Sequence, residues 1–537
     1  MASVAIPQLS GYRRPAVLDW IMTVDHKKLG ILYLYFTLFF FAVGGILALL
    51  VRTQLSVADS TFVGNDAYNQ IFTMHASAML FLFIIPVWAG FGNYFVPLQI
   101  GAADMAFPRI NALSFWLLPP AGILMFSGFL VDGGSANAGW TAYSPLAQQA
   151  GVGMDMWIVA VFMLGASSTI GAANFLVTMF RMRAPGMTMF RMPIFCWTML
   201  VTALLQLLAT PVLAAALAML FIDRNYGGSF FDPNGGGNVV LWQNVFWFYS
   251  HPAVYIMILP GMGIVSEILP VFSRKPLFGY KAFVFATIAI GALGFSVWAH
   301  HMFTTGSVLL PFFGFMTFMI GIPTGVKIFN WLGTLWGGSI SFTTPMLFAL
   351  GFVSMFLIGG INGTFSAAVP VDFALHDTYF VVAHIHYVLF GGSVFAVFAG
   401  LYYWFPKIWG RMLDERLGRL HFTFMFIGFN LAFFPMHMLG LDGMPRRIAV
   451  YSEDAGWETL NMISTLGAFT IAVSMIPFLI AVVWAFMRPQ DQPDNPWEGN
   501  TLEWATSSPP PEHNFDSLPP VRSERPLFDA RQNGDGH

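Results

Sequence analysis

The stretch GILYLYFTLFFFAVGGILALLV, residues 30–51, carries no charged side chain and is long enough to cross a bilayer, since a spanning helix needs roughly 20 apolar residues. Eleven similar stretches follow it. They lie near residues 71–97, 112–131, 152–180, 194–222, 240–271, 281–305, 308–331, 345–368, 380–404, 421–440 and 461–487. None shows the two-residue alternation of a transmembrane β-strand. The sequence therefore predicts an all-α membrane protein, a bundle of twelve transmembrane helices.

The composition agrees with this fold class. Of the 537 residues, 56% are hydrophobic and 9% are charged, whereas soluble domains usually contain about 25% charged residues. These values argue against a soluble enzyme, a disordered protein and a nucleic-acid binder. The single cysteine, Cys196, permits no intramolecular disulfide, so any metal site must use His, Asp or Glu. The first residues, MASVAIPQLSGYRRP, lack the apolar core of a secretory signal.

The basic residues predict the orientation of the bundle. An even number of spans places both chain ends on one side of the membrane, and most of the 24 Lys and Arg residues fall on that side. The exceptions are Arg52, Arg224, Arg446 and Arg447 on the other side, and Lys327 within a span. Because cytoplasmic loops carry the excess of basic residues, both termini are expected to be cytoplasmic. The predicted organisation is a cytoplasmic segment 1–29, a membrane domain 30–487 and a Pro-rich cytoplasmic tail 488–537 that extends along the membrane surface or a partner.

Histidine is costly inside a bilayer, so a histidine within a span is a candidate for function. Six of the twelve histidines lie in the predicted spans: His75, His251, His300, His301, His384 and His386. Successive residues on a helix are about 100° apart, so His384 and His386, in the motif HIH, project to nearly opposite faces. One helix could then provide an axial ligand to each of two haems, or it could make polar contacts to two neighbouring helices.

The other paired histidines suit a copper ion. His251 and Tyr255, in the motif HPAVY, are four residues apart and share one face of a helix. Pro252 is expected to kink that helix. His300 and His301 are adjacent, near the end of a span. Three imidazoles bind copper tightly, although adjacent histidines could instead line a proton path.

Around these histidines the sequence resembles subunit I of the haem-copper oxygen reductases. The resemblance runs from DHKKLG at 25–30 to PRRI at 445–448. It includes the motifs TMHASAM, GNYFVPLQIGAADMAFPRIN, GASSTIGAANF, HPAVYIMILPGMGIVSE, WAHHMFTTG, IPTGVKIFNW and LHDTYFVVAHIHYV. It implies a respiratory terminal oxidase in the cell's inner (plasma) membrane. Such an enzyme reduces O₂ to water with four electrons and four protons and pumps further protons across the membrane.

The resemblance also assigns ligands to two haems and one copper. The low-spin haem would be held by His75 and His386, the high-spin haem that binds oxygen by His384, and the copper by His251, His300 and His301. Haem type A is expected, with type O as the alternative. Tyr255 would be bonded covalently to the ring of His251 and would supply an electron and a proton for O–O cleavage. An ordinary buried phenol is the alternative for Tyr255.

Further residues follow from the same resemblance. Two arginines, Arg446 and Arg447, would neutralise haem propionates, with Trp140 nearby. Arg52 would hydrogen-bond a substituent of the low-spin haem. An outer magnesium site would use His376 and Asp377 and would be completed by a carboxylate from subunit II.

Two proton paths are implied. The first leads to the active-site tyrosine through Lys327, Thr324 and Ser266; a buried lysine releases its proton readily, although Lys327 could instead pair with a carboxylate. The second starts at Asp104 and continues past Asn93, Asn111, Asn174, Ser167 and Ser168. Here the chain departs from the family pattern twice. Ala112 replaces an asparagine, and Ala253 replaces the glutamate of HPEVY, where the proton route branches.

A tyrosine offers a replacement for that glutamate. Tyr249 is one helical turn before Ala253 and on the same helix face, with Ser250 beside it. A Tyr-Ser pair before HP, without the glutamate, resembles a subgroup that still pumps protons. We therefore expect Tyr249 and Ser250 to bridge the second path.

The expected electron donor is cytochrome c, or a cytochrome domain on a partner, acting through a dicopper site in subunit II; a subunit III is also expected. Quinol-oxidising relatives carry an Arg, an Asp and a His at positions aligned with Val43, Leu47 and Ala67, and only a matching Gln70 remains here. They also tend to replace Asp377. A quinol oxidase is the alternative within the family.

Two other classes explain the sequence less well. Nitric oxide reductases share the six histidines, but they lack Tyr255 and use iron in place of copper. A twelve-span transporter would show paired, broken helices in two symmetric halves, and no internal symmetry is evident. A transporter also has no need of six histidines at ligand spacings.

Overall fold

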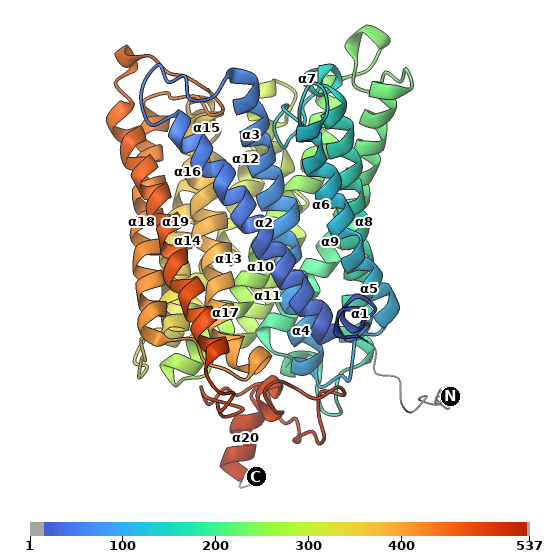
Figure 1. The fold of residues 1–537 in the computed structure, drawn as a ribbon, viewed down its shortest axis with the longest axis vertical. Helices are drawn as coiled ribbons and strands as arrows, with labels where there is room; N and C mark the ends of the chain where they lie inside the picture. Colours follow the sequence, from blue (N-terminus) through green and yellow to red (C-terminus); the bar gives the residue numbers. More distant parts are fainter. Residues whose placement is uncertain (1–14, 534–537) are drawn as a thin grey trace.

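The computed structural model describes residues 15–533, which contain twelve helical spans long and apolar enough to cross a membrane and no β-strand (Figure 1). The predicted all-α bundle is confirmed. The spans are α2 (His26–Gln54), α3–η1–α4 (Asn65–Ile100), α5–α6–η2 (Pro108–Leu130), α8 (Val152–Arg181), α9 (Ile194–Asn225), α10 (Val239–Ser273), α11–η5 (Tyr280–Thr305), α12–α13 (Leu310–Leu335), α14 (Thr344–Ala367), α16–η6–α17 (Tyr379–Trp409), α18 (Glu415–Leu441) and α19 (Glu458–Met487). Shorter helices are α1 (Ala16–Ile21), α7 (Leu146–Gln149), η3 (Met189–Arg191), η4 (Pro233–Gly235), α15 (Val369–Leu375), η7 (Glu453–Ala455), η8 (Leu502–Ala505) and α20 (Pro526–Asn533).

Helix α10 lies in the middle of the bundle. In its most apolar window 78% of the residues are buried, against 28% for α2 and α19, so the latter leave most of their surface to lipid. α10 contacts α9, η5, α13 and α17 and continues as one helix through Pro252. Residues four and seven apart share a helix face, so His251, Tyr255, Met262 and Ser266 form a single row along α10.

Two spans change their helix type just after a histidine. The π-helical turn η1 (Ala78–Ile84) begins three residues after His75, and the π-helical turn η6 (Leu389–Val394) begins three residues after His386. π-turns inside α-helices frequently mark functional sites. The adjacent His300 and His301 lie in η5 (Trp298–Thr305), which is a 3-10 helix rather than the α-helix that a 100° spacing assumes.

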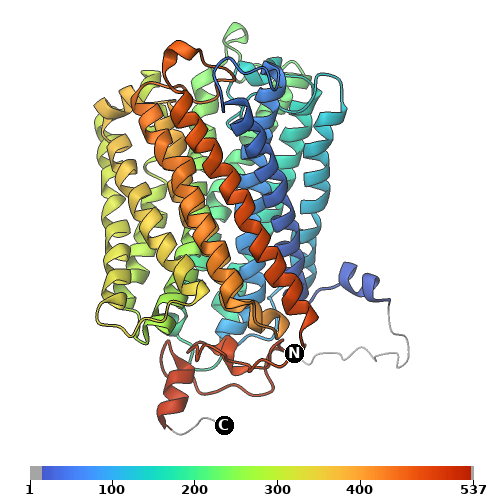
Figure 2. The same cartoon turned by 60° about the vertical axis from the view of Figure 1, so that its left-hand side comes forward.

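The C-terminal residues 488–533 pack against one end of the bundle, the same end at which α1 lies (Figures 1 and 2). Buried polar side chains join them to the spans. The Glu503 carboxylate accepts from Gln99 Nε2 at 3.0 Å, and Lys407 Nζ donates to the Thr506 carbonyl at 2.6 Å. The expected extended tail thus carries the short helices η8 and α20 and covers this end. Residues 1–14 and 534–537 lie outside the described residues, so the cytoplasmic side of both termini stays a prediction.

Candidate functional site

Three histidines meet in the middle of the bundle. His251 comes from α10, and His300 and His301 come from η5, which α10 contacts. One nitrogen from each ring lies within 4.8 Å of the other two, and His251 Nδ1 is 3.3 Å from His301 Nε2. Trp247 stacks on the His301 ring with centroids 3.7 Å apart, and Thr317 Oγ1 lies 3.1 Å from His300 Nδ1. Nitrogen donors gathered this closely fit one copper ion.

The surroundings of the three histidines also favour a bound metal. His251 Nε2 is buried without a hydrogen-bond partner, which is costly for a polar atom unless it binds something else. No described Asp or Glu lies within ion-pair distance of the three rings. The site is therefore built from neutral imidazoles, which are the form that binds metal.

Tyr255 packs directly against this trio. Its ring centroid is 4.8 Å from that of His251, one helical turn away on α10. A Cβ added at Gly294 would lie 3.0 Å from Tyr255 Cδ2, so the glycine in α11 leaves room for the phenol. His251 and Tyr255 therefore lie together on one face of α10, as their spacing predicts.

A second pair of histidines faces each other across a gap. The rings of His75 and His386 are 5° from parallel, and their centroids are 6.5 Å apart, too far for ring contact. His75 Nδ1 lies 2.8 Å from the Gly44 carbonyl, and His386 Nδ1 lies 2.8 Å from the Val382 carbonyl. These carbonyls fix the Nδ1–H tautomer and leave Nε2 free for a metal. Two imidazole–metal bonds of about 2 Å each fit the separation.

His384 faces the other way from His386, as the HIH spacing predicts. Its Nδ1 is 2.6 Å from Asn362 Oδ1 and 3.0 Å from the Gly359 carbonyl, both on α14. Asn362 Nδ2 in turn contacts His437 Nε2 at 2.7 Å. A Cβ at Gly363 would come within 2.8 Å of the His384 ring. Asn362 and His437 therefore orient this ligand, a role that sequence analysis missed because it arises between three helices.

Arg52 is buried at the end of α2 and only partly satisfied. One of its terminal nitrogens donates to the Asn461 carbonyl at 2.8 Å and to Thr465 Oγ1 at 3.2 Å. Its Nε and other terminal nitrogen are buried without partners among residues 15–533. Free guanidinium donors of this kind fit an acceptor on a bound cofactor.

Arg447 lies against Gly139 and Thr141, the two residues that flank Trp140 in the chain. The Arg446 guanidinium pairs with Asp377, although its Nε is buried without a partner, and Arg447 Nη2 donates to Thr141 Oγ1 at 3.3 Å. Burial, together with the charge of Arg446, lowers the pKa of Arg447 to about 10. This concentration of positive charge fits anionic cofactor substituents.

His376 and Asp377 lie next to the two arginines. His376 Nε2 is 3.6 Å from Asp377 Oδ2, and His376 Nδ1 is 3.7 Å from Asp372 Oδ2. Burial and the charge of Asp377 raise the pKa of Asp372 to about 7. Asp372 was not among the predicted residues, although an acidic residue four positions before a histidine on a helix is the signal that finds it.

Lys327 is fully buried on α13. Its Nζ lies 3.3 Å from Met262 Sδ and 4.5 Å from the Phe283 ring centroid. Ser266 Oγ, one turn further along α10, donates to the Met262 carbonyl at 2.7 Å. Thr324 lies one turn from Lys327 and donates to its own helix. No carboxylate within the described residues pairs with Lys327, so the structural ion pair considered as its alternative role is absent.

The polar residues predicted for the second path are partly brought together. Asn111 Nδ2 donates to Asn93 Oδ1 at 2.6 Å, and Ser167 Oγ donates to the Ser114 carbonyl at 2.6 Å. A cavity of about 420 Å³ of space not filled by protein atoms lies between them. Its polar lining is Tyr33, Asn93, Ser114, Ser167, Ser168 and Gln206, of which the first, third and last were not predicted.

The ends of that path are less continuous. Burial raises the pKa of Asp104 to about 6, and Asn174 Oδ1 accepts from the backbone of Phe107 at 3.0 Å, fixing the connection after Asp104. Tyr249 is buried and has no hydrogen-bond partner among residues 15–533, and Ser250 Oγ is buried and unpartnered. Neither of these two residues lines the cavity.

Comparison with known proteins gives consistent matches. Residues 28–470 match the family described as cytochrome c and quinol oxidase polypeptide I. Cytochrome c oxidase subunit 1 of Corynebacterium efficiens is 53% identical over 97% of this chain and 91% of its own. The Thermostichus vulcanus protein of the same name is 52% identical over 97% and 96%. A structure of a haem-copper terminal oxidase dimer superposes with a TM-score of 0.72 at 17% identity, covering 97% of this chain and all of that one, which shows a shared fold.

Proposed function

The chain belongs to the cytochrome c and quinol oxidase polypeptide I family, the haem- and copper-containing catalytic subunits of respiratory terminal oxidases, and we propose that it reduces O₂ with electrons from cytochrome c. It is a multi-pass membrane protein that works with other oxidase subunits. The observation that carries the proposal is the convergence of three imidazoles on one point, beside a phenol.

We assign the metal ligands as follows. His75 and His386 would hold the low-spin haem, His384 the high-spin haem, and the trio at 251, 300 and 301 the copper. When bound, the haem iron and copper bind O₂ and pass it electrons. The haems are proposed to be type A, with Arg52 donating to a substituent of the low-spin one and Arg446 and Arg447 neutralising propionates beside Trp140.

We propose that the side chains around the metals position the reacting groups and supply protons to the bound oxygen. Tyr255 would donate a proton from its hydroxyl and an electron from its ring, and would be bonded covalently to the ring of His251. Lys327, Thr324 and Ser266 would deliver protons to Tyr255 along α10. This proposal draws support from the row that His251, Tyr255, Met262 and Ser266 form on one helix face.

The second path would begin at Asp104 and supply pumped protons through the cavity beside Asn93 and Ser167. A carboxyl whose pKa is about 6 changes protonation near neutral pH, which suits a group that collects protons. Asn111, Asn174 and Ser168 would hold water along this route, and Tyr249 with Ser250 would continue it towards the metals.

Tyr249→Phe tests the last step. Removing the hydroxyl is expected to slow turnover and lower the number of protons translocated per electron, because Phe cannot pass a proton. The measurement is oxygen uptake together with proton release from reconstituted vesicles. Tyr226→Phe, at the exposed end of α9, is the matched control. Full turnover with full proton translocation in Tyr249→Phe would show that the route runs elsewhere.

The proposed partners follow from the residues at the outer end. A carboxylate from subunit II would join His376 and Asp377 in a magnesium site, and a dicopper centre in subunit II would pass electrons to the low-spin haem. A subunit III is also proposed. Both termini would be cytoplasmic in the inner (plasma) membrane, as the distribution of basic residues indicates.

Oxygen uptake by the purified complex tests the donor. Uptake is expected with reduced cytochrome c and not with a reduced quinol, because Val43, Leu47 and Ala67 occupy the positions of quinol-contacting residues in quinol-oxidising relatives. Haem and copper content measured on the same sample serves as the control. Uptake with quinol would contradict the proposed donor. A third outcome is that the protein contains its haem and copper, takes up oxygen with neither donor, and turns over nitric oxide. That result would contradict oxygen as the substrate.

A further inference from the structure

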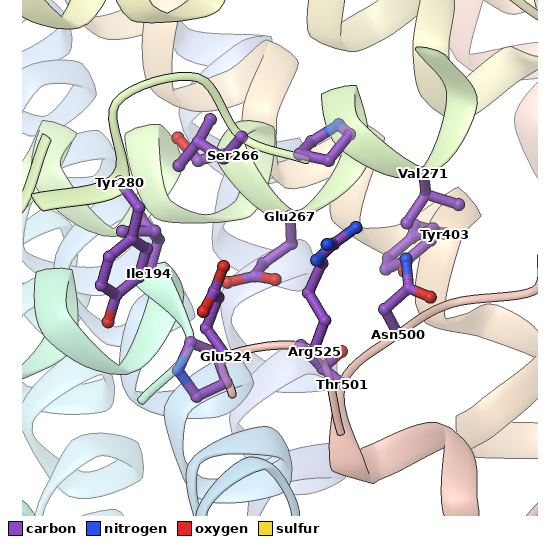
Figure 3. A pocket seen from close by; sticks show the side chains of 13 residues that line it. Ile194, Ser266, Glu267, Val271, Tyr280, Tyr403, Asn500, Thr501, Glu524 and Arg525 are labelled. Carbon is purple, nitrogen blue, oxygen red and sulfur yellow. The ribbon is translucent and has the colours of Figure 1, made fainter. Parts of the chain in front are cut away.

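A polar cavity lies where the C-terminal residues meet the bundle (Figure 3). About 490 Å³ of space there, part of it open to solvent, is not filled by protein atoms. α10 contributes Ser266 and Glu267 to its wall, α11 contributes Tyr280, and the C-terminal residues contribute Glu524 and Arg525. The hydroxyl and charged groups around this space suit water rather than an apolar ligand.

The cavity adjoins the Lys327 path through Ser266. This serine lines the cavity and also accepts a hydrogen bond from Trp331 Nε1 at 2.9 Å inside the bundle. Its own hydroxyl donates to the carbonyl of Met262, whose sulfur lies 3.3 Å from Lys327 Nζ. About one helical turn, roughly 6 Å, therefore separates the cavity wall from the residue that contacts the lysine.

Glu267 follows Ser266 directly in α10 and lines the same cavity. One of its oxygens accepts from the Phe195 backbone N–H at 3.0 Å, which fixes the side chain against the first turn of α9. In Figure 3 its carboxylate points into the cavity. No described Lys or Arg forms an ion pair with it, so no fixed cation holds it in the ionised form.

Glu524 stands on the opposite wall, in the C-terminal segment. It is half-buried and therefore reaches both the cavity and solvent. Figure 3 shows Glu267 and Glu524 facing one cavity from two sides, one from α10 and one from the segment that covers it. The two carboxylates are separated in the chain by the whole second half of the bundle, so only the packing of the C-terminal segment brings them together.

We propose that this cavity is the entrance of the Lys327 path, with Glu524 taking up a proton from solvent and Glu267 passing it inward. The proposal rests on the oxidase function proposed above. In each transfer between oxygens one O–H bond breaks and one forms, and in the last transfer an O–H bond breaks and an N–H bond forms. The proton leaves water for Glu524, crosses cavity water to Glu267, and leaves Glu267 through water and Ser266 for the amine of Lys327, which becomes an ammonium. The C-terminal segment thus takes part in proton uptake.

Glu267→Gln in the assembled complex tests the inner carboxylate. The amide keeps an oxygen to accept from the Phe195 N–H but cannot take up a proton. Under anaerobic conditions, reduction of the high-spin haem is expected to slow about tenfold while reduction of the low-spin haem is unchanged, since water still bridges part of the route. The slowing should increase with pH, and Glu267→Asp should restore most of the rate. Glu512→Gln, an exposed glutamate of the same segment away from the cavity, is the matched control.

The outcomes separate this inference from the oxidase function. A wild-type complex that lacks haem or does not reduce oxygen contradicts the function itself. An active wild type in which Glu267→Gln reduces both haems as fast as Glu512→Gln overturns the entrance and leaves the function intact. If Glu267→Gln does not assemble with haem, Glu524→Gln tests the proposed entrance instead. Slower reduction of the high-spin haem alone in this variant would support the entrance, and an unchanged rate would overturn it.

Discussion

Tyr255→Phe is expected to lower oxygen reduction by about 10³-fold, because the variant loses the hydroxyl that donates a proton to the bound oxygen and the phenol that supplies an electron. The ring itself stays, so packing against His251 and the contact with Gly294 are preserved. The measurement is oxygen uptake with the normal donor, together with haem and copper content. The metals are expected to be retained, since Tyr255 is not one of the proposed ligands.

Tyr402→Phe is the matched control for this substitution. Tyr402 is also buried, and its hydroxyl lies 3.1 Å from His421 Nδ1, away from the three-histidine site. Its loss leaves a buried nitrogen unpaired, which costs about 1–3 kcal/mol of stability, but oxygen uptake should stay near wild type. Substantial turnover in Tyr255→Phe would mean that another group supplies the proton and the electron.

The second large effect is expected for Lys327→Met, which keeps the length of the side chain and removes its protonatable amine. Because no other titratable group lies between Ser266 and Tyr255 on α10, proton delivery should fall by about 10²-fold. Stopped-flow spectra under anaerobic conditions are the measurement. The low-spin haem should be reduced at the normal rate and the high-spin haem only slowly, since each electron there needs a proton.

Lys407→Met is the control for the loss of a buried lysine. Lys407 is as buried as Lys327, but its amine donates to backbone carbonyls of the C-terminal segment rather than into the bundle. Its variant should reduce the high-spin haem at the wild-type rate. Equal rates in the two methionine variants would contradict the role of Lys327.

Sequence reasoning reached the features that depend on spacing within one helix. The run at 30–51 and its eleven successors predict the spans, and the four-residue separation of His251 and Tyr255 predicts their contact. The two-residue separation of His384 and His386 predicts their opposite directions. The individual metal roles came from the family resemblance, because spacing alone does not say which ring faces which metal.

Features that depend on packing between distant segments were beyond the sequence. Asn362 orients His384 only because α14 and α16 lie side by side, and Glu524 reaches the α10 cavity only because the chain folds back under the bundle. The pattern of Pro, Asp and Ser after residue 488 indicates a polar segment, but it does not reveal what that segment covers. Helix type was missed for the same reason, since the 3-10 geometry of His300 and His301 is set by their neighbours.

The two π-turns, η1 and η6, make the aim of His75 and His386 depend on chain length as well as on chemistry. A π-turn holds one residue more than an α-turn, so deleting one residue within 78–84 would let the span revert to a regular α-helix. His75 would then rotate by about 100° relative to α4 and turn away from His386. These two segments should therefore accept many changes of side chain during evolution but very few insertions or deletions. Among related proteins, their length should vary less than their sequence.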